Sequence, residues 1–201
     1  MKKKVIILDY GLGNYESLKA AFSNLNCDIN ISNLKSELKK SDLIILPGVG
    51  TFPEAIKNLK KLRLDKFLKK LSTRGKKILG ICLGMQLLTY SSDELVFTEG
   101  LKIIKGKFKC MKKHNIGWSK LDYLKKKNNI SRLNKDYFFF QHGISYTGPK
   151  KNIFAYTQGF SNLISIIKEN NTIGVQFHPE KSQAAGINFL NSLLQKEIWN
   201  A

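Results

Sequence analysis

A cysteine enclosed by glycines is the part of this sequence that points most directly to chemistry. Cys82 stands in Gly80-Ile81-Cys82-Leu83-Gly84, the thiol form of the sharp strand-to-helix turn that exposes a nucleophile. A sulfur at the start of a helix is favoured as the thiolate, which is the reactive form, and the Leu83 N–H lies where it can help to stabilise an oxyanion. Taken alone, Cys82 could also be a small buried hydrophobic residue.

A histidine and a glutamate two residues apart can complete a triad with this thiol. His178 follows Thr172–Phe177, a β-like run that would bring it to the edge of the same sheet. In an extended segment the side chains of His178 and Glu180 project to one side, and Pro179 fixes the backbone between them. A polar turn is the plain alternative for this tripeptide. Beside the cysteine turn we favour a nucleophile, a base and an orienting carboxylate: Cys82, His178 and Glu180.

A second donor for an oxyanion is expected from another loop of the sheet. Pro47–Gly50 follows a predicted parallel strand, as the cysteine loop does. Its glycines allow a backbone N–H to point into a site at the carboxyl ends of the strands. A tight turn without a role in catalysis is the alternative for this loop.

The elements that must position these residues alternate between strand and helix in the first half. Helical patterns run through Leu18–Leu25 and from about Pro53 to Leu71, and a further helix begins just after Cys82. The predicted strands are short apolar runs that end in glycine-containing turns: Val5–Leu8, Leu43–Leu46 and Lys76–Gly80. This order predicts an α/β fold with a mostly parallel central sheet and helices on both faces.

The second half adds short strands separated by turn signals. They are Leu101–Met111, Ile116–Leu121, Tyr137–Phe140, Ile153–Thr157, Leu163–Lys168 and Thr172–Gln176. An exposed loop is expected at Lys125–Asn129, and a closing helix from about Ala184 to Lys196. Because no linker or internal repeat interrupts the chain, we expect residues 1–201 to form a single domain.

Composition excludes several classes of protein. The apolar runs are too short to cross a bilayer, and Val5–Leu8 after the amino-terminal lysines is too short for a signal peptide, so we expect a cytoplasmic protein with no membrane contact. The odd number of cysteines (Cys27, Cys82 and Cys110) does not indicate a disulfide framework. No spacing of Cys or His indicates a metal site, and we expect no metal and no cofactor.

The net charge of +19 invites a comparison with nucleic-acid-binding proteins. Of the 34 basic residues, however, only Arg63, Arg74 and Arg132 are arginines, and readout of phosphate and bases tends to use the arginine fork. We therefore expect no nucleic-acid partner and favour a coding bias toward lysine. An acidic protein partner remains a second use for the charge.

These motifs together resemble the class I, or triad, glutamine amidotransferases. The resemblance extends from Val5 to the last helix, and within that superfamily the chain is most similar to the glutaminase subunits of imidazole glycerol phosphate synthase. The segments that carry it are Asp9–Asn14, Pro47–Phe52, Gly80–Gln86 and Gly174–Ser182. The resemblance implies that the chain hydrolyses L-glutamine through a cysteine thioester. It would then pass ammonia to a (β/α)₈ cyclase subunit that makes imidazole glycerol phosphate and AICAR in histidine biosynthesis, the two chains forming a heterodimer.

The resemblance also implies roles for residues outside the triad. The N–H groups of Val49 and Leu83 would hold the oxyanion, and glutamine would bind near Gly50 and Gln86. Asn14 and Lys181 match positions expected at the interface with the synthase subunit; a solvated lysine is the alternative for Lys181.

Two segments depart from the family pattern. The usual Pro-His-x-Gly-Trp-Asn reads His114–Ser119 here, with Asn115 in place of the motif histidine. The usual Phe-x-His-Ser-Tyr falls on Phe140–Tyr146, where either Gly143-Ile144 replace Ser-Tyr or Ser145-Tyr146 are displaced. A glutaminase that supplies a sugar-amidating enzyme of surface glycan synthesis is therefore kept as an alternative.

Overall fold

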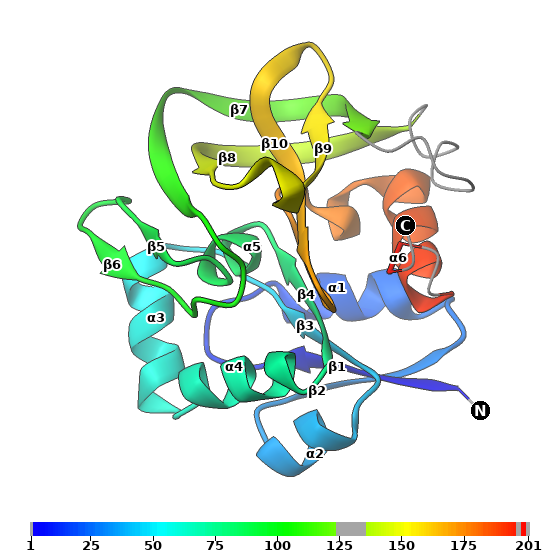
Figure 1. The fold of residues 1–201 in the computed structure, drawn as a ribbon. Coiled ribbons are helices and arrows are strands. Elements are labelled where there is room, and N and C mark those ends of the chain that lie inside the picture. The colour runs from blue at the N-terminus through cyan, green and yellow to red at the C-terminus, as the bar shows by residue number, and fades with distance from the viewer. Residues whose placement is uncertain (1, 124–135, 196–197, 200–201) are drawn as a thin grey trace.

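Parallel strands form the centre of the protein. The computed structural model describes residues 2–123, 136–195 and 198–199 (Figure 1). Adjacent strands in this part of the sheet all run parallel. In spatial order they are β2 (Cys27–Ser32), β1 (Lys3–Leu8), β3 (Leu43–Leu46), β4 (Lys77–Ile81) and β11 (Thr172–Val175). The loops that leave the carboxyl ends of these strands therefore meet along one edge, where sites of open α/β sheets form.

An antiparallel portion continues the sheet beyond β11 and rises above the parallel part in Figure 1. It consists of β10 (Phe160–Glu169), β9 (Ile153–Thr157), β7 (Lys107–Tyr123) and β8 (Tyr137–Thr147). The short strand β5 (Ser91–Ser92) pairs with the start of β7, and β6 (Thr98–Glu99) pairs with β5. The 3₁₀ turn η2 (Lys150–Asn152) precedes β9.

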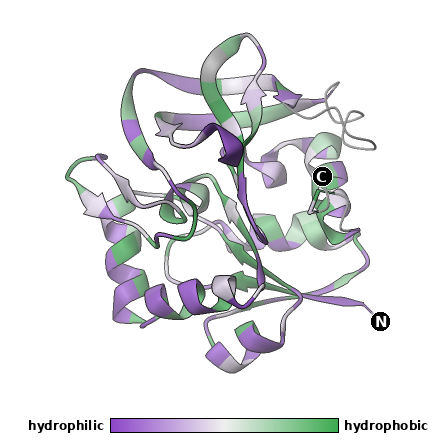
Figure 2. Cartoon of the chain, viewed as in Figure 1, coloured by the Kyte–Doolittle hydropathy of each residue, from purple (hydrophilic) through white to green (hydrophobic). Residues whose placement is uncertain are grey.

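Helices cover both faces of the parallel sheet. Val5 and Ile7 of β1 belong to the buried cluster that includes α1 (Tyr15–Phe22) and α6 (Gln183–Leu194). The alternate residues Ile6 and Leu8 belong to the opposite cluster, as the two-residue period of a strand requires. That second face carries α2 (Lys35–Lys40), α3 (Phe52–Lys61), α4 (Asp65–Thr73) and the short α5 (Leu83–Leu87). Figure 2 shows hydrophobic strands at the centre of the sheet and helices in which hydrophilic and hydrophobic residues alternate.

The predicted fold class is confirmed, and the strands Leu43–Leu46 and Ile153–Thr157 have their predicted bounds. The prediction of a single helix from Pro53 to Leu71 is wrong, because the helix ends after α3 and a second helix, α4, begins at Asp65. Arg63 has a φ of +54°, and the Leu64 N–H returns to the Leu59 carbonyl at 2.8 Å. This left-handed residue with a buried leucine after it is a common way to end a helix.

The prediction of separate strands at Leu101–Met111 and Ile116–Leu121 is also wrong. One strand, β7, spans Lys107–Tyr123. The apolar residues before it pack under α5 instead of pairing in a sheet, and the N–H groups of Leu101 and Ile104 bond to the last carbonyls around α5. The strand β2 and the helix α2 were not predicted at all. The loop expected at Lys125–Asn129 and the end of the closing helix at Lys196 lie outside the described residues.

Candidate active site

Cys82 occupies a strained turn between β4 and α5. Its φ is +51°, a value that residues with a Cβ rarely adopt and that persists where the surrounding structure imposes it. The Cys82 N–H bonds to the Val175 carbonyl of β11 at 2.8 Å, so β11 fixes the turn. A Cβ on Gly84 would overlap the Leu46 carbonyl, and one on Gly80 would lie 2.5 Å from Gly84 O. The glycines thus permit the close packing that presents the sulfur.

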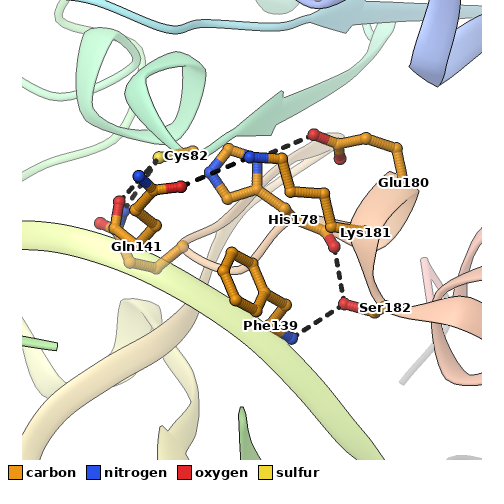
Figure 3. Close-up of polar contacts among 8 residues, drawn as sticks. Cys82, Phe139, Gln141, His178, Glu180, Lys181 and Ser182 are labelled. Carbon is orange, nitrogen blue, oxygen red and sulfur yellow. Dashed lines mark hydrogen bonds and ion pairs between the residues drawn. The ribbon is translucent and has the colours of Figure 1, made fainter. Parts of the chain in front are cut away.

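His178 lies between Cys82 and Glu180 just after β11 (Figure 3). Its Nδ1 is 2.8 Å from Glu180 Oε1, and the two side chains are only 5% and 2% exposed. Burial disfavours the imidazolium, but the adjacent Cys82 and Glu180 outweigh burial and raise the pKa of His178 to about 9. Glu180 belongs to the 3₁₀ turn η3 (Pro179–Lys181). The arrangement holds His178 with one nitrogen toward a carboxylate and the ring beside the thiol.

Ser182 fixes the backbone of His178, a contact that the sequence analysis did not identify. Its hydroxyl donates to the His178 carbonyl at 2.6 Å and accepts the Phe139 N–H of β8 at 3.0 Å. The His178 N–H donates to the Phe139 carbonyl at 2.9 Å. Figure 3 shows this bridge between the histidine and β8. Because Ser182 is fully buried, these bonds tie the imidazole to the antiparallel part of the sheet.

The loop after β3 packs directly on the cysteine turn. A Cβ on Gly48 would lie 2.6 Å from Leu83 Cβ, and Gly50 has a φ of +107°. The hydroxyl of Tyr10, which is 2% exposed, donates to the Pro47 carbonyl at 2.7 Å and anchors the start of the loop. Within the described part of the chain, no hydrogen bond is formed by the N–H of Val49 or of Leu83. Both donors are free for a ligand.

A cavity of about 430 Å³ opens at this edge of the sheet, a size typical of small-molecule sites. Most of the predicted site residues line it: Cys82, His178, Val49, Leu83, Gly50, Gln86 and Lys181. Glu180 stands behind His178 rather than in the cavity wall. Asn14 is exposed in the turn before α1 and does not line the cavity. The Lys181 Nζ lies 3.4 Å from Gln141 Oε1 at the rim.

Glu94 is a cavity residue that the sequence analysis missed. It lies in the loop between β5 and β6 and is the acidic residue among those that line the cavity. Its carboxylate accepts the Phe52 N–H at 2.6 Å, which joins this loop to the start of α3. Glu94 ends a run of polar residues that follows α5, which is the only local sign of a polar site there. Nothing in the sequence places that run beside the cysteine.

The two segments that depart from the family pattern face each other across β7 and β8. Asn115 pairs with His142 in the sheet register. The Nδ1 of His142 lies 2.8 Å from the Ile144 carbonyl and its Nε2 lies 3.1 Å from Asn115 Nδ2. Burial lowers the pKa of His142 to about 4, with His178 and His114 acting in the same direction and the Ile144 carbonyl opposing it. His142 is therefore a neutral ring in the cavity wall.

The same segment resolves the choice left open around Gly143. Gly143 and Ile144 line the cavity, whereas Tyr146 turns away from it and bonds through its hydroxyl to the Lys105 carbonyl. A Cβ on Gly143 would lie 2.8 Å from the ring of His114. Gly143-Ile144 thus stand at the pocket, and Ser145-Tyr146 do not.

The chemistry that this arrangement supports is acyl transfer through a thiol. A nucleophile, a buried histidine with a raised pKa and two free N–H donors converge on one cavity, which is the set such a reaction needs. Among the described residues, no group of three or more His, Cys, Asp or Glu side chains could hold a metal ion. In that same portion of the chain, no helix is both long and apolar enough to span a membrane.

Comparisons with known proteins point to one family. Residues 6–195 match the family described as "Glutamine amidotransferase class-I". The chain is 38% identical over 200 residues to the imidazole glycerol phosphate synthase subunit HisH of Lactococcus lactis, covering 96% of this chain and 99% of the relative. It is 37% identical to the subunit HisH 2 of Vibrio vulnificus, with 95% and 94% covered.

Solved structures have the same fold at low sequence identity. One described as a glutamine amidotransferase has a TM-score of 0.75 at 14% identity and covers 94% of this chain and 97% of its own. PurLQS from Thermotoga maritima has a TM-score of 0.74 at 19% identity, with 96% and 98% covered. At these identities the likeness bears on the fold alone.

Proposed function

The chain belongs to the class I glutamine amidotransferase family, and from that membership we propose that it is the glutaminase subunit of an imidazole glycerol phosphate synthase. It hydrolyses L-glutamine to glutamate and ammonia and delivers the ammonia to a (β/α)₈ synthase subunit in histidine biosynthesis. The observation that carries the proposal is the alignment of Cys82, His178 and Glu180 at one cavity. The HisH relatives, which match over nearly the whole chain, support the assignment of the partner.

In the proposed reaction, the Cys82 thiolate attacks the side-chain carboxamide carbon of glutamine. The carbonyl electrons move onto oxygen, and the N–H groups of Val49 and Leu83 stabilise this oxyanion. His178 as imidazolium protonates the nitrogen, so that ammonia leaves and a thioester to Cys82 remains. The free N–H groups of both loops and the raised pKa of His178 support these roles.

Hydrolysis of the thioester regenerates the thiol. Neutral His178 takes a proton from water, the hydroxide attacks the thioester carbon, and the proton returns to sulfur as glutamate leaves. Glu180 keeps the imidazole oriented through the 2.8 Å bond to Nδ1 and stabilises its charged form.

The charges around the cavity suit an amino acid substrate. Glu94 supplies a carboxylate for the α-ammonium group of glutamine, and the carboxamide of Gln86, which is 4% exposed, supplies a neutral polar contact. Gly50 leaves room for the substrate beside the loop after β3. A site that pairs a buried polar group with each polar group of the ligand rejects analogues that lack them.

The partner face is proposed at the rim of the same edge. Asn14 and Lys181 are exposed and lie in loops that follow β1 and β11, so a partner that contacts both covers the mouth of the cavity. Such a position allows ammonia to pass without entering bulk water. We also propose a cytoplasmic location, which three free cysteines fit.

The test is to copurify the chain with its synthase partner and to measure glutamate and imidazole glycerol phosphate with either glutamine or an ammonium salt as the nitrogen source. C82A should abolish synthesis from glutamine and leave synthesis from ammonium intact, because the partner's chemistry does not need the thiol. C110S, which alters an exposed cysteine outside the cavity, should retain both. Loss of both activities in C82A would contradict the proposed division of labour.

The same experiment separates the two acceptors. A complex that releases glutamate but makes no imidazole glycerol phosphate, and instead aminates a sugar substrate, would support the alternative in surface glycan synthesis. The Asn115–His142 pair is where this chain departs from the expected pattern, and its His142 lies in the cavity wall and not among the triad residues.

A further inference from the structure

A second amide, outside the triad, contacts the reactive sulfur. The Nε2 of Gln176 donates to Cys82 Sγ at 3.7 Å, and the Gln176 side chain is 1% exposed. We infer that Gln176 is a further catalytic residue, whose carboxamide N–H stabilises the Cys82 thiolate together with the His178 imidazolium. This inference deepens the proposed function and rests on it.

The backbone delivers Gln176 to the sulfur with little freedom. In the parallel pair β4 and β11, Val175 lies opposite Ile81, and the Cys82 N–H continues the ladder to the Val175 carbonyl. The Gln176 N–H is held by the Ser165 carbonyl of β10 at 2.9 Å. Gln176 follows Val175 and Cys82 follows Ile81, so these two residues also lie side by side.

The chain bends at Gln176 and Phe177 after β11, and the Gln176 carboxamide and the His178 ring both lie against Cys82. Phe177 between them points into the apolar core, where its ring centroid lies 4.4 Å from that of Phe138 and 5.1 Å from that of Phe189. This anchor holds both polar neighbours toward the cysteine turn. The order Gln-Phe-His thus places two polar side chains on one sulfur, from a single strand end.

A purely structural role does not account for the Gln176 amide. Its carboxamide oxygen is buried and has no hydrogen-bond partner among the described residues. A buried amide with half of its hydrogen-bonding capacity unmet destabilises a fold, so an apolar residue of the same length would serve packing better. A donor to a thiolate explains why the amide is there, since hydrogen bonds to a charged acceptor are stronger than those between neutral groups.

One contact acts in the other direction. The Gln141 backbone carbonyl lies 3.9 Å from Cys82 Sγ and favours the protonated thiol, because a carbonyl oxygen can only accept a hydrogen bond. The Gln176 contact is shorter and has the opposite sign. The pH dependence of the Cys82 thiol reactivity therefore shows whether the Gln176 carboxamide donates a hydrogen bond to the sulfur.

The experiment measures the alkylation rate of Cys82 by iodoacetamide across a pH series, in a C27A/C110S background that leaves one thiol. Gln176→Met keeps the length and removes the donor, and should move the midpoint of the rate profile upward by about one to two pH units. Gln176→Glu replaces the donor by an anion and should move it further. With the synthase partner present, Gln176→Met should lower kcat roughly tenfold or more and leave KM for glutamine nearly unchanged.

Gln141→Met is the matched control, because its carboxamide is directed to Lys181 and not to the sulfur. It should leave the midpoint where it is. A Gln176→Met midpoint equal to that of the control, or displaced downward, would overturn the inference; a downward shift would mean that the carboxamide oxygen faces a protonated thiol. Near-UV circular dichroism tests whether each variant is folded. If Gln176→Met does not fold, the midpoint of Gln176→Glu tests the same contact. Because alkylation needs no glutamine, this result is independent of the C82A test of the proposed function.

Discussion

Two histidines in one cavity are held in opposite protonation states by their neighbours. His178 faces a carboxylate and a thiol, and its pKa rises to about 9. His142 faces a carboxamide and a backbone carbonyl, is buried, and has a pKa near 4. The environments of the two rings thus push their pKa values apart, and only His178 stands beside the reactive thiol. The neutral ring of His142 also keeps a second positive charge away from His178.

Glu180→Gln should weaken the proposed triad while leaving its shape. The amide removes the negative charge that stabilises the imidazolium, so the pKa of His178 falls and the alkaline limb of the kcat profile moves to lower pH. We expect kcat to fall by roughly 10²–10⁴-fold, as for orienting carboxylates in other triads. Steady-state rates of the heterodimer across a pH series test this. An unchanged alkaline limb would show that Glu180 does not act on His178.

His142 should make the fold sensitive to acid. Its folded pKa of about 4 lies below the ordinary 6.5, so the unfolded chain binds a proton that the folded chain refuses. The stability that depends on neutral His142 is present above about pH 6.5 and is lost as the pH falls toward 4. Between pH 7 and 5 this amounts to about 2 kcal/mol. Urea unfolding of the wild type and of His142→Gln should show a smaller loss for the variant; equal losses would contradict this.

At the scale of elements, the site is a set of loops at the carboxyl ends of β3, β4 and β11, held at contact distance by glycines. Gly84 packs on the Leu46 carbonyl and Gly48 on Leu83. The cysteine turn, the loop after β3 and the start of α5 are therefore one packed unit. A change in any of these elements moves the sulfur relative to the proposed oxyanion donors.

Gly84→Ala should disrupt this unit. The added methyl group overlaps the Leu46 carbonyl, and the expected loss of unfolding free energy is about 1–3 kcal/mol or more, with loss of glutaminase activity. Gly159→Ala is the control, since Gly159 has a φ of +81° but open space around its Cβ position. It should cost about 1 kcal/mol and leave activity intact. A destabilisation of Gly84→Ala no larger than that of Gly159→Ala, with activity retained, would contradict the packed turn.

The elements differ in how far sequence could predict them. The turn at Cys82 and the strand before His178 carry local signals, glycine pairs and apolar runs, and these were predicted. Strand β2 was missed although Cys27, Ile29 and Ile31 alternate with polar residues, because its apolar residues are only partly buried and form no continuous apolar run. Glu94 and Gln176 reach the site through loop packing and strand register. Glu94 has no signal within a short window of sequence, whereas Gln176 stands only two residues before His178.

At the scale of the whole molecule, basic charge and an open cavity edge agree with a subunit that works in a complex. The net charge is +19, and Lys181 stands at the rim of the cavity. Such a surface speeds association with an acidic partner at low salt. That residues 1–201 form one domain stays a prediction, as do the interface roles of Asn14 and Lys181.

Lys181→Met should weaken the heterodimer roughly tenfold or more without changing the alkylation of Cys82 in the isolated chain. Lys70→Met, an equivalent change on the exposed side of α4, should leave the affinity for the synthase subunit unchanged. Binding isotherms at two salt concentrations test both variants. Equal affinities for the two variants would place the partner elsewhere.

In the proposed reaction, Cys82 carries the acyl group of glutamine. The most direct measurement is rapid acid quenching of the heterodimer during turnover, followed by mass spectrometry of the peptides that contain Cys27, Cys82 and Cys110. We expect a glutamyl thioester on the Cys82 peptide alone, which forms within the time of one turnover and is absent from C82A. Turnover of glutamine with no adduct on Cys82, or with the adduct on another cysteine, would contradict it.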